Sequence, residues 1–387
     1  MPEAIAAGLR LERLVCHKLQ ESPMSETVTD TADPFQFRTL QPEDIGECIR
    51  IAIENFDEFR DHPQYISQWF ERRIVHNPWQ SSLPGPGVGV WHGSRLIGFR
   101  AMFAQPWWLN EKSTTLAFGA NTCIDSAYRG KGLATALIKF SCGLSAINGS
   151  VTAGVITQKS FGACGFVKIG GESNDFFRLR IGYRGSWEKR VGKTMGRILG
   201  GVFDLGLSWR DRKLYRREFV LEETGHCGAE FDSLWERAKT EYPSCLERSG
   251  RYLNWRLFEF PTCPLQLLAL RDSNGELRAY AIWHRQSFAD SISMAVLRDV
   301  FYLPQDEPAI RGLLYHVFAY WRKNGISWGN LEVATPRLTA LFKELGYEAL
   351  GSHGNRYQIY SNPPLPDAVL SEWYRSGIDG DYFDHPL

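Results

Sequence analysis

Three absences narrow what this sequence can be. It has no run of about eighteen consecutive apolar residues, so no segment is expected to span a membrane as a helix. Its formal net charge is zero, which gives no general attraction to nucleic acid. Its eight cysteines include no Cys-x-x-Cys pair, which argues against a zinc site and against a disulfide framework. We therefore expect reduced thiols, no metal ion and a cytoplasmic location.

The length of 387 residues predicts about two domains. Residues 1–33 join a short amphipathic piece to a tract rich in Ser, Thr, Asp and Glu, so we expect a disordered leader. Met24 is an alternative start, because the first run typical of a strand begins at Phe35. No apolar region with a secretory cleavage site is visible near Met1.

Residues 121–138 have the pattern of a strand end, a glycine loop and the first turns of a helix. Apolar residues recur every three or four positions from Leu133 to Ile147, which predicts a helix with one buried face. Gly130 and Gly132 stand just before this helix, where the absence of a side chain lets the backbone approach a ligand closely. The unpaired amides of a first helical turn attract anions, so the stretch predicts a phosphate site.

Two cations, Arg129 and Lys131, strengthen this prediction. The alternative interpretation is a glycine-containing turn with two solvated basic residues. A nucleotide-triphosphate loop would end in Gly-Lys-Ser or Gly-Lys-Thr, which this loop lacks, and a dinucleotide fingerprint needs a different glycine spacing.

The segment Arg129-Gly-Lys-Gly-Leu-Ala134 resembles the acyl-CoA pyrophosphate loop of the GNAT N-acetyltransferase superfamily. The flanking order is similar too, with an extended run at 114–124, the helix, a β run at 151–157 and a Gly-Phe pair at 165–166. The resemblance implies a mixed α/β fold and acetyl-CoA as co-substrate. It implies that the pantetheine arm and the pyrophosphate are bound by Ile124, Arg129, Gly130, Lys131, Gly132, Leu133, Ala134 and Thr135.

The sequence departs from the family pattern at one position. Many members have a tyrosine, four residues before the glycine of the Gly-Phe pair, that protonates the leaving thiolate, and this chain has Phe161 there. Water, Ser160, Thr157 or Tyr128 would have to take that role. A thiol pKa of about 8.5 makes an unassisted thiolate a tolerable leaving group, so catalysis is still expected.

A general base must deprotonate an ammonium acceptor. Asp125 is the first candidate and Asn121 the second, since both lie close in sequence to the reacting centre. Two expected helices, at 45–53 and 63–76, would wall the acceptor pocket in a GNAT fold. Their polar residues are either acceptor-binding groups or a solvated helix face: Glu54, Asp57, Glu58, His62 and His76.

Residues 182–219 differ in composition from the rest, with ten Lys and Arg against four Asp and Glu, a net charge of +6. An apolar, glycine-rich run at 198–209 lies between two basic clusters. We interpret 182–217 as a linker helix whose apolar face packs on the two domains. The alternative is a basic amphipathic segment that rests on an anionic membrane surface.

The second half repeats features of the first at a spacing of 181 to 186 residues, which predicts a duplicated domain. Trp255 matches Trp69, and the Phe-x-x-x-Gly pattern that ends at Gly346 matches the one that ends at Gly165. In the second copy, residues 304–308 replace the glycines and cations of the loop with prolines and carboxylates. Such acids repel a pyrophosphate, so the second copy is expected not to bind CoA in this mode.

We therefore predict two tandem GNAT-like domains, of which the second is degenerate. The predicted parts are a leader at 1–33, a GNAT domain at 34–181, a basic linker at 182–217, a second domain at 218–362 and a tail at 363–387. The adjacent Trp107 and Trp108 are expected in the core or at its rim rather than stacked on a sugar.

Two short stretches, at 251–256 and 373–381, resemble GNAT proteins of bacterial polysaccharide and cell-envelope gene clusters. This resemblance implies a small-molecule amine acceptor such as an amino sugar. Either the tail is a frayed polar end or it brings these groups to the cleft: Asp379, Asp381, Asp384 and His385.

The predicted function is acetyl transfer from acetyl-CoA to an amine. A CoA sensor or scaffold without catalysis is one alternative, suggested by Phe161. An aminoacyltransferase of the peptidoglycan-bridge type is another, although such enzymes generally lack an intact CoA loop, which this chain has.

Overall fold

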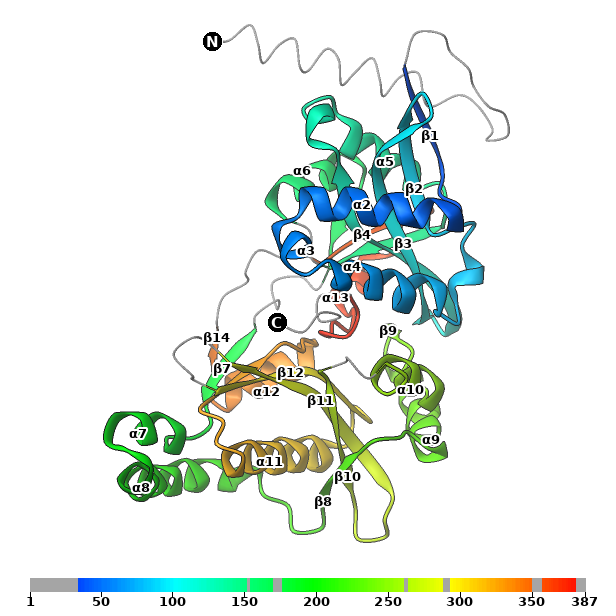
Figure 1. Cartoon of the computed structure of the whole chain (residues 1–387). Coiled ribbons are helices and arrows are strands. Elements are labelled where there is room, and N and C mark those ends of the chain that lie inside the picture. Colours follow the sequence, from blue (N-terminus) through cyan, green and yellow to red (C-terminus); the bar gives the residue numbers. More distant parts are fainter. Residues whose placement is uncertain are drawn as a thin grey trace, which may run out of the picture.

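The computed structural model describes residues 34–151, 154–169, 176–260, 264–287, 293–349 and 357–380. The expected leader at residues 1–33 lies outside these ranges. Within them the chain forms two mixed sheets with helices packed on them, which confirms the predicted α/β class (Figure 1). Buried side chains from both halves belong to one continuous core that extends from Leu40 to Ile378.

The first sheet has the strand order β1-β2-β3-β4-β5-β15-β6, and β9 pairs with the end of β3. Its strands are β1 (Phe35–Thr39), β2 (Gly87–His92), β3 (Arg95–Leu109), β4 (Lys112–Ile124), β5 (Ile147–Ser150), β6 (Val167–Lys168), β9 (Ser244–Leu246) and β15 (Gln358–Ser361). All neighbouring strands are antiparallel except β4 and β5, which are parallel.

The second sheet has the order β14-β7-β13-β12-β11-β10-β8. Its strands are β7 (Phe177–Arg180), β8 (Val220–Thr224), β10 (Gln266–Arg271), β11 (Leu277–Ser287), β12 (Ser293–Tyr302), β13 (Trp328–Leu331) and β14 (Glu348–Ala349). Here too a single neighbouring pair, β12 and β13, is parallel.

The helices follow the same division. The first half has α2 (Ile45–Asn55), α3 (Asp57–Asp61), α4 (Pro63–Phe70), α5 (Leu133–Ser141) and α6 (Val155–Ala163). Two helices connect the halves, α7 (Arg184–Val191) and α8 (Lys193–Asp211), and the second half has α9 (Ala229–Ala238), α10 (Gly250–Leu257), α11 (Glu307–Lys323), α12 (Pro336–Glu344) and α13 (Asp367–Ser371). Short 3₁₀ or π turns occur at Pro42–Asp44, Glu71–Val75, Gln80–Ser82, Ser126–Tyr128, Arg212–Leu214 and Lys239–Glu241.

The two halves are structural repeats. Read from β1 and from β8, both sheets have three antiparallel neighbours, then a parallel pair, then two antiparallel neighbours. The tryptophans matched in the sequence, Trp69 and Trp255, are both buried. Gly165 and Gly346 follow α6 and α12 with φ of 84° and 74°, values that favour glycine. The predicted duplication is therefore visible in the fold.

The repeats exchange one strand. β15 comes from the end of the chain and lies between β5 and β6 of the first sheet. β7 comes from the first half and lies between β13 and β14 of the second sheet. Each half is thus completed by the other. The predicted boundaries at 181 and 362 remain predictions, and a strand crosses in each direction between the two ranges.

One expected strand is wrong. The run at 151–157 is rich in β-branched residues, but the strand is β5, which ends at Ser150, and helix α6 begins at Val155. The preceding helix is also shorter than expected, since α5 ends at Ser141 and Ile147 begins β5. A four-residue strand between two helices has too few residues to show an alternating pattern, which explains the shift.

The linker at 182–217 is helical, but its expected packing is wrong. Helices α7 and α8 form a hairpin beside α11 at the outer end of the second half (Figure 1). Most of the large apolar side chains of α8 lie exposed, and its buried residues are instead small and acidic: Gly196, Gly200, Asp204 and Asp211.

Candidate functional site

The predicted site lies where two parallel strands diverge. β4 and β5 pair only at Ala117 with Asn148 and at Phe118 with Gly149. β4 continues to Ile124, so from Gly119 onward the edge of β4 on the side of β5 is paired with no strand among the described residues. We call this divergence the β4–β5 fork. It presents backbone amides and carbonyls that a ligand with its own amide groups can pair with.

A β-bulge lies within the fork. The pairing of β3 with β4 shifts by one residue between Phe99 and Ala101, and Asn121 has a φ of 48°. The Nδ2 of Asn121 is buried and has no hydrogen-bond partner among the described residues. A buried donor without a partner is costly, so it is a candidate for a bond to a bound molecule.

The glycine loop follows directly from β4. Gly130 and Gly132 have φ of 79° and 76°, and a Cβ on either would meet nothing within 4 Å. Gly132 is the N-cap of α5, and no side chain caps the helix. The first amides of α5 therefore face open space at the positive end of the helix dipole, as the sequence predicted.

The two cations of the loop have different contacts. The Arg129 side chain donates to the Ile124 carbonyl (3.2 Å) and to the Asn55 Oδ1 (2.7 Å), which ties the loop to β4 and to the end of α2. The Lys131 Nζ lies 5.3 Å from the centre of the Tyr128 ring and is exposed. Arg129 thus shapes the loop, while Lys131 is accessible to an anion.

Asp125, the first candidate base, is tied into the same turn. It is buried, it accepts from the Ala127 amide (3.1 Å), and its other oxygen pairs with Arg95 (2.7 Å). The contacts hold the start of the loop in place. The roles of Asp125 and Asn121 in catalysis remain predictions.

Phe161 lies in the core of the first half. Its ring is fully buried, and its centre lies 4.5 Å from that of Phe166. The alternative donor adjacent in the sequence, Ser160, is bonded to Thr135 at the start of α5 (2.9 Å between the hydroxyl oxygens). Sequence reasoning missed Arg100, a cation in the buried part of β3.

Arg100 is buried beneath the fork. It is 1% exposed and lies opposite the bulge, where its Nη1 donates to the Thr122 hydroxyl (2.8 Å). Its guanidinium lies against Gly119, where a Cβ would come within 2.0 Å of it, and 5.1 Å from the centre of the Phe161 ring. A positive charge is thereby placed next to Phe161. The signal in the sequence was an arginine inside the run Phe99 to Phe103.

The second half provides an internal comparison. At the start of α11 the Asp306 side chain accepts from the Ala309 amide (3.2 Å) and forms an ion pair with Arg278. Pro308 stands in the first turn and has no amide hydrogen to offer. The expected acidic cap of this helix is therefore confirmed. The start of α11 is blocked to an anion, whereas the start of α5 is open.

In the second half, β12 and β13 diverge as β4 and β5 do, and we call this divergence the second fork. The C-terminal segment of the chain occupies it. β12 and β13 pair as far as Leu297 and Leu331, and beyond that point the C-terminal segment enters. The Gly377 amide donates to the Arg298 carbonyl (2.6 Å), and Arg375 pairs with Ala334 through two backbone bonds. The corresponding edge of β4 has no such occupant among the described residues. The first half therefore carries the open fork.

From the second fork the C-terminal segment continues to the first. Gly380 lies against Val151, just after β5, and its carbonyl accepts from the buried Arg73 (2.8 Å). The Asp379 carbonyl accepts from Gln105 of β3. One of the four predicted tail residues, Asp379, is thus part of the junction, together with its neighbour Gly380. The other three, Asp381, Asp384 and His385, lie outside the described residues.

The Asp379 carboxyl is completely buried. It accepts from the Ser376 amide (2.9 Å), and its second oxygen has no partner among the described residues. Burial raises its pKa to about 8, although Arg248 lowers it in part. The unfolded value is about 3.9, so folding favours the protonated form. This stabilising contribution is complete below about pH 4 and is lost as the pH rises through about 8.

Replacing Asp379 with Asn is expected to remove this dependence. The difference in melting temperature between the variant and the parent protein should rise between pH 4 and pH 8, in favour of the variant. Melting curves at each pH measure it, and Asp57→Asn, at an exposed carboxylate, is the control. A difference that stays constant with pH would show that Asp379 does not titrate in this way.

The candidate acceptor residues lie on the outer face of the helices. Glu54 and Asp57 form ion pairs with arginines one turn away, and His76 pairs with Glu71. Glu58 and His62 are exposed. These contacts favour the solvated-face interpretation. Trp107 and Trp108 are buried, as expected, and the Trp107 indole donates to Ser244 of the second half (2.8 Å).

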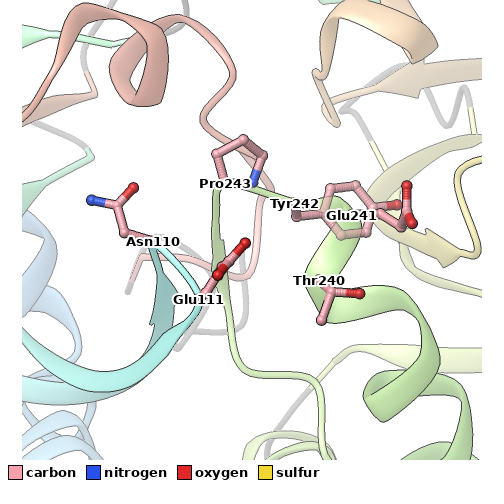
Figure 2. A pocket seen from close by; sticks show the side chains of 6 residues that line it. All are labelled: Asn110, Glu111, Thr240, Glu241, Tyr242 and Pro243. Carbon is pink, nitrogen blue, oxygen red and sulfur yellow. The ribbon is translucent and has the colours of Figure 1, made fainter.

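A hollow of about 340 Å³ lies between the halves, away from the fork. Figure 2 shows its lining residues, which come from the β3–β4 turn and from the segment before β9: Asn110, Glu111, Thr240, Glu241, Tyr242 and Pro243. The turn is at the opposite end of β4 from the glycine loop, roughly 40 Å along the strand. The lining contains no cation and no uncapped helix start, so the hollow does not suit a pyrophosphate.

Comparisons with known proteins agree with the fold. A GCN5-related N-acetyltransferase from Anabaena variabilis is 14% identical, with 84% of this chain and 72% of that chain covered at a TM-score of 0.56. A probable N-acyltransferase from Enterococcus faecalis is 9% identical, with the same coverage and a TM-score of 0.54. A GCN5-related N-acetyltransferase from Kribbella flavida is 13% identical, with 86% and 71% covered and a TM-score of 0.51. No protein-family model and no curated sequence matches. These likenesses show a tandem GNAT-like fold.

Proposed function

From this tandem GNAT-like fold we propose that the protein is an N-acyltransferase that moves an acetyl group from acetyl-CoA to an amine. One observation carries the proposal: a single half combines an open fork with an uncapped helix start. Its repeat has the same strands, but the entrance is capped by Asp306 and the fork is occupied by Gly377. Degeneration of one copy beside an intact one is expected if the intact copy binds the co-substrate.

The residues of the first half fit an acyl-CoA. The amides from Gly130 to Thr135 would hold the pyrophosphate, with Lys131 as the accessible cation. The backbone of Ile124 and the free edge of β4 would pair with the amides of the pantetheine arm. The Nδ2 of Asn121 gives one further donor at the bulge.

The chemistry is a direct transfer. The nitrogen of the neutral amine attacks the thioester carbon, and the proton of the ammonium that forms passes to a base, for which Asp125 is the named candidate. The other predicted catalytic residue, Asn121, has an amide side chain that does not accept a proton at neutral pH, so it would act as a hydrogen-bond donor. The carbon–sulfur bond then breaks and leaves CoA as a thiolate, which takes a proton from water or a nearby hydroxyl. Since Phe161 has no proton to donate, we assign stabilisation of the thiolate to the charge of Arg100.

The acceptor side is formed by both halves. The C-terminal segment reaches the fork at Gly380, and the π turn that follows α4, Glu71–Val75, contacts it through Arg73. A small amine such as an amino sugar is the acceptor class that we propose, on the resemblance of residues 251–256 and 373–381 to cell-envelope GNAT proteins.

Release of free thiol from acetyl-CoA tests the proposal. Turnover that depends on an amine, measured with a thiol reagent across amino sugars, amino acids and polyamines, is the expected result. Tight CoA binding without turnover across this panel would support a sensor or scaffold instead. An aminoacyltransferase would transfer from aminoacyl-tRNA and ignore acetyl-CoA.

A further inference from the structure

Helix α8 directs its apolar face to the solvent rather than to the core. Five large apolar side chains lie along one face of the helix and are 54 to 76% exposed: Met195, Ile198, Val202, Leu205 and Trp209. We call this row the α8 stripe. Its members are three or four residues apart, so they form a continuous line of about 21 Å. Surface helices normally turn such a face towards the core.

The opposite face of α8 is the one that packs on the protein. Gly196 and Gly200 approach α7 so closely that a Cβ on either would come within 2.5 Å of its backbone. Asp204 is buried and forms an ion pair with Arg184 (3.2 Å). Asp211 is buried and forms an ion pair with Arg322 of α11 (2.5 Å). The helix is thus anchored through small and acidic residues, which leaves the stripe directed outwards.

Cations surround the two ends of the stripe. Arg190 and Lys193 are exposed before it, and Arg212, Lys213 and Arg217 are exposed after it. The segment 182–219 has a net charge of +6, while the whole chain has a net charge of zero. The positive charge of the molecule is therefore concentrated where its apolar side chains are most exposed.

We propose that the α7–α8 hairpin binds the surface of a membrane that contains anionic phospholipids. The stripe would enter the boundary between head groups and acyl chains, with α8 parallel to the bilayer plane. The cations at its ends would contact lipid phosphates. Trp209, at 76% exposure, is a residue type favoured at that boundary. No described helix is long and apolar enough to cross a bilayer, so the contact is peripheral.

The charge pattern and the shape favour this occupant. A second copy of the chain would place two basic hairpins against each other, which is unfavourable. A straight row on a single protruding hairpin also suits a plane better than a concave partner. The proposal does not rest on the proposed function, because binding of the hairpin to a vesicle requires neither CoA nor the fork.

Co-sedimentation of the full-length protein with vesicles is the test. Binding is expected to vesicles of equal parts phosphatidylglycerol and phosphatidylcholine at low salt. It should fall at least about tenfold with phosphatidylcholine alone, and fall on addition of salt as the charges are screened. The variant Val202→Ser/Leu205→Ser/Trp209→Ser should lose the binding while its melting temperature and CoA affinity stay unchanged. Arg190→Glu/Lys193→Glu/Arg212→Glu/Lys213→Glu should lose it as well.

A matched control changes exposed valines elsewhere. Val75→Ser/Val167→Ser alters two side chains of the first half that are 53% and 45% exposed, and it should bind as the parent protein does. Absence of vesicle binding, or binding that the stripe variant keeps, would overturn the proposal. So would a dimer that the stripe variant converts to a monomer, since a second copy would then cover the stripe.

Discussion

Replacing Gly132 with Glu is expected to weaken acetyl-CoA binding at least about 100-fold. The new carboxylate would stand at the start of α5, where the pyrophosphate is proposed to bind, and two like charges about 4 Å apart near a protein surface repel by about 4 kcal/mol. The fold should remain intact, because a Cβ at Gly132 would meet no atom within 4 Å. Titration calorimetry with acetyl-CoA measures the change.

The backbone cost of this substitution can be measured separately. Gly132 has a φ of 76°, so any side chain there is strained. Gly275, in the β10–β11 turn, has a φ of 80° and equally open surroundings. Gly275→Glu should therefore lower the melting temperature by a similar amount and leave acetyl-CoA affinity unchanged. Unchanged affinity in Gly132→Glu would show that the loop does not hold the cofactor.

Replacing Arg248 with Met is expected to lower the free energy of unfolding strongly. Arg248 and Asp299 form a two-bond ion pair (2.9 and 3.0 Å) in which neither side chain is exposed. Arg248 also lies 4.2 Å from the centre of the Tyr374 ring in the C-terminal segment. The substitution leaves the Asp299 charge buried without its partner, which typically costs about 3–5 kcal/mol. Urea unfolding followed by tryptophan fluorescence gives the free energy of unfolding.

A second variant isolates the cause. Arg248→Met/Asp299→Leu removes both charges and should lose less stability than Arg248→Met alone, since well-packed apolar pairs often replace buried ion pairs at little cost. Arg60→Met, at a pair in which both side chains are largely exposed, should change the free energy of unfolding by less than about 1 kcal/mol. A comparably small loss in Arg248→Met would contradict the role given to the buried pair.

The glycine loop was predictable because its signals are local. The positive φ of Gly130 and Gly132, the uncapped start of α5 and the acidic cap at Asp306 all depend on residues a few positions apart. The duplication was predictable for a related reason. Matched turns and buried tryptophans recur at spacings of 181 to 186 residues, and no pairing between distant segments is needed to see them.

The strand exchange was not predictable in this way. β15 pairs with β5 across about two hundred residues, and an unexchanged repeat would show the same pattern of strands in its sequence. The route of the C-terminal segment was unpredictable for the same reason. Gly377 and Gly380 contact forks in different halves, which depends on how the halves are placed together.

Helix α8 shows a different limit. The sequence predicted an amphipathic helix whose apolar face packs on the two domains, but that face is exposed. Periodicity assumes that apolar residues turn inwards. Here the inward face is determined by the close approach that Gly196 and Gly200 allow and by the pairing of the buried Asp204 and Asp211 with Arg184 and Arg322. Arg100 was missed because a charge in an apolar strand usually marks an edge rather than a buried site.

A crystal structure with CoA tests the central claim most directly. The account predicts pyrophosphate oxygens within about 3 Å of backbone amides between Gly130 and Thr135. It predicts the pantetheine arm along the β4 edge from Gly119 to Ile124, and no second molecule at the start of α11. CoA bound in the hollow beside Pro243, or in the second half, would contradict the account.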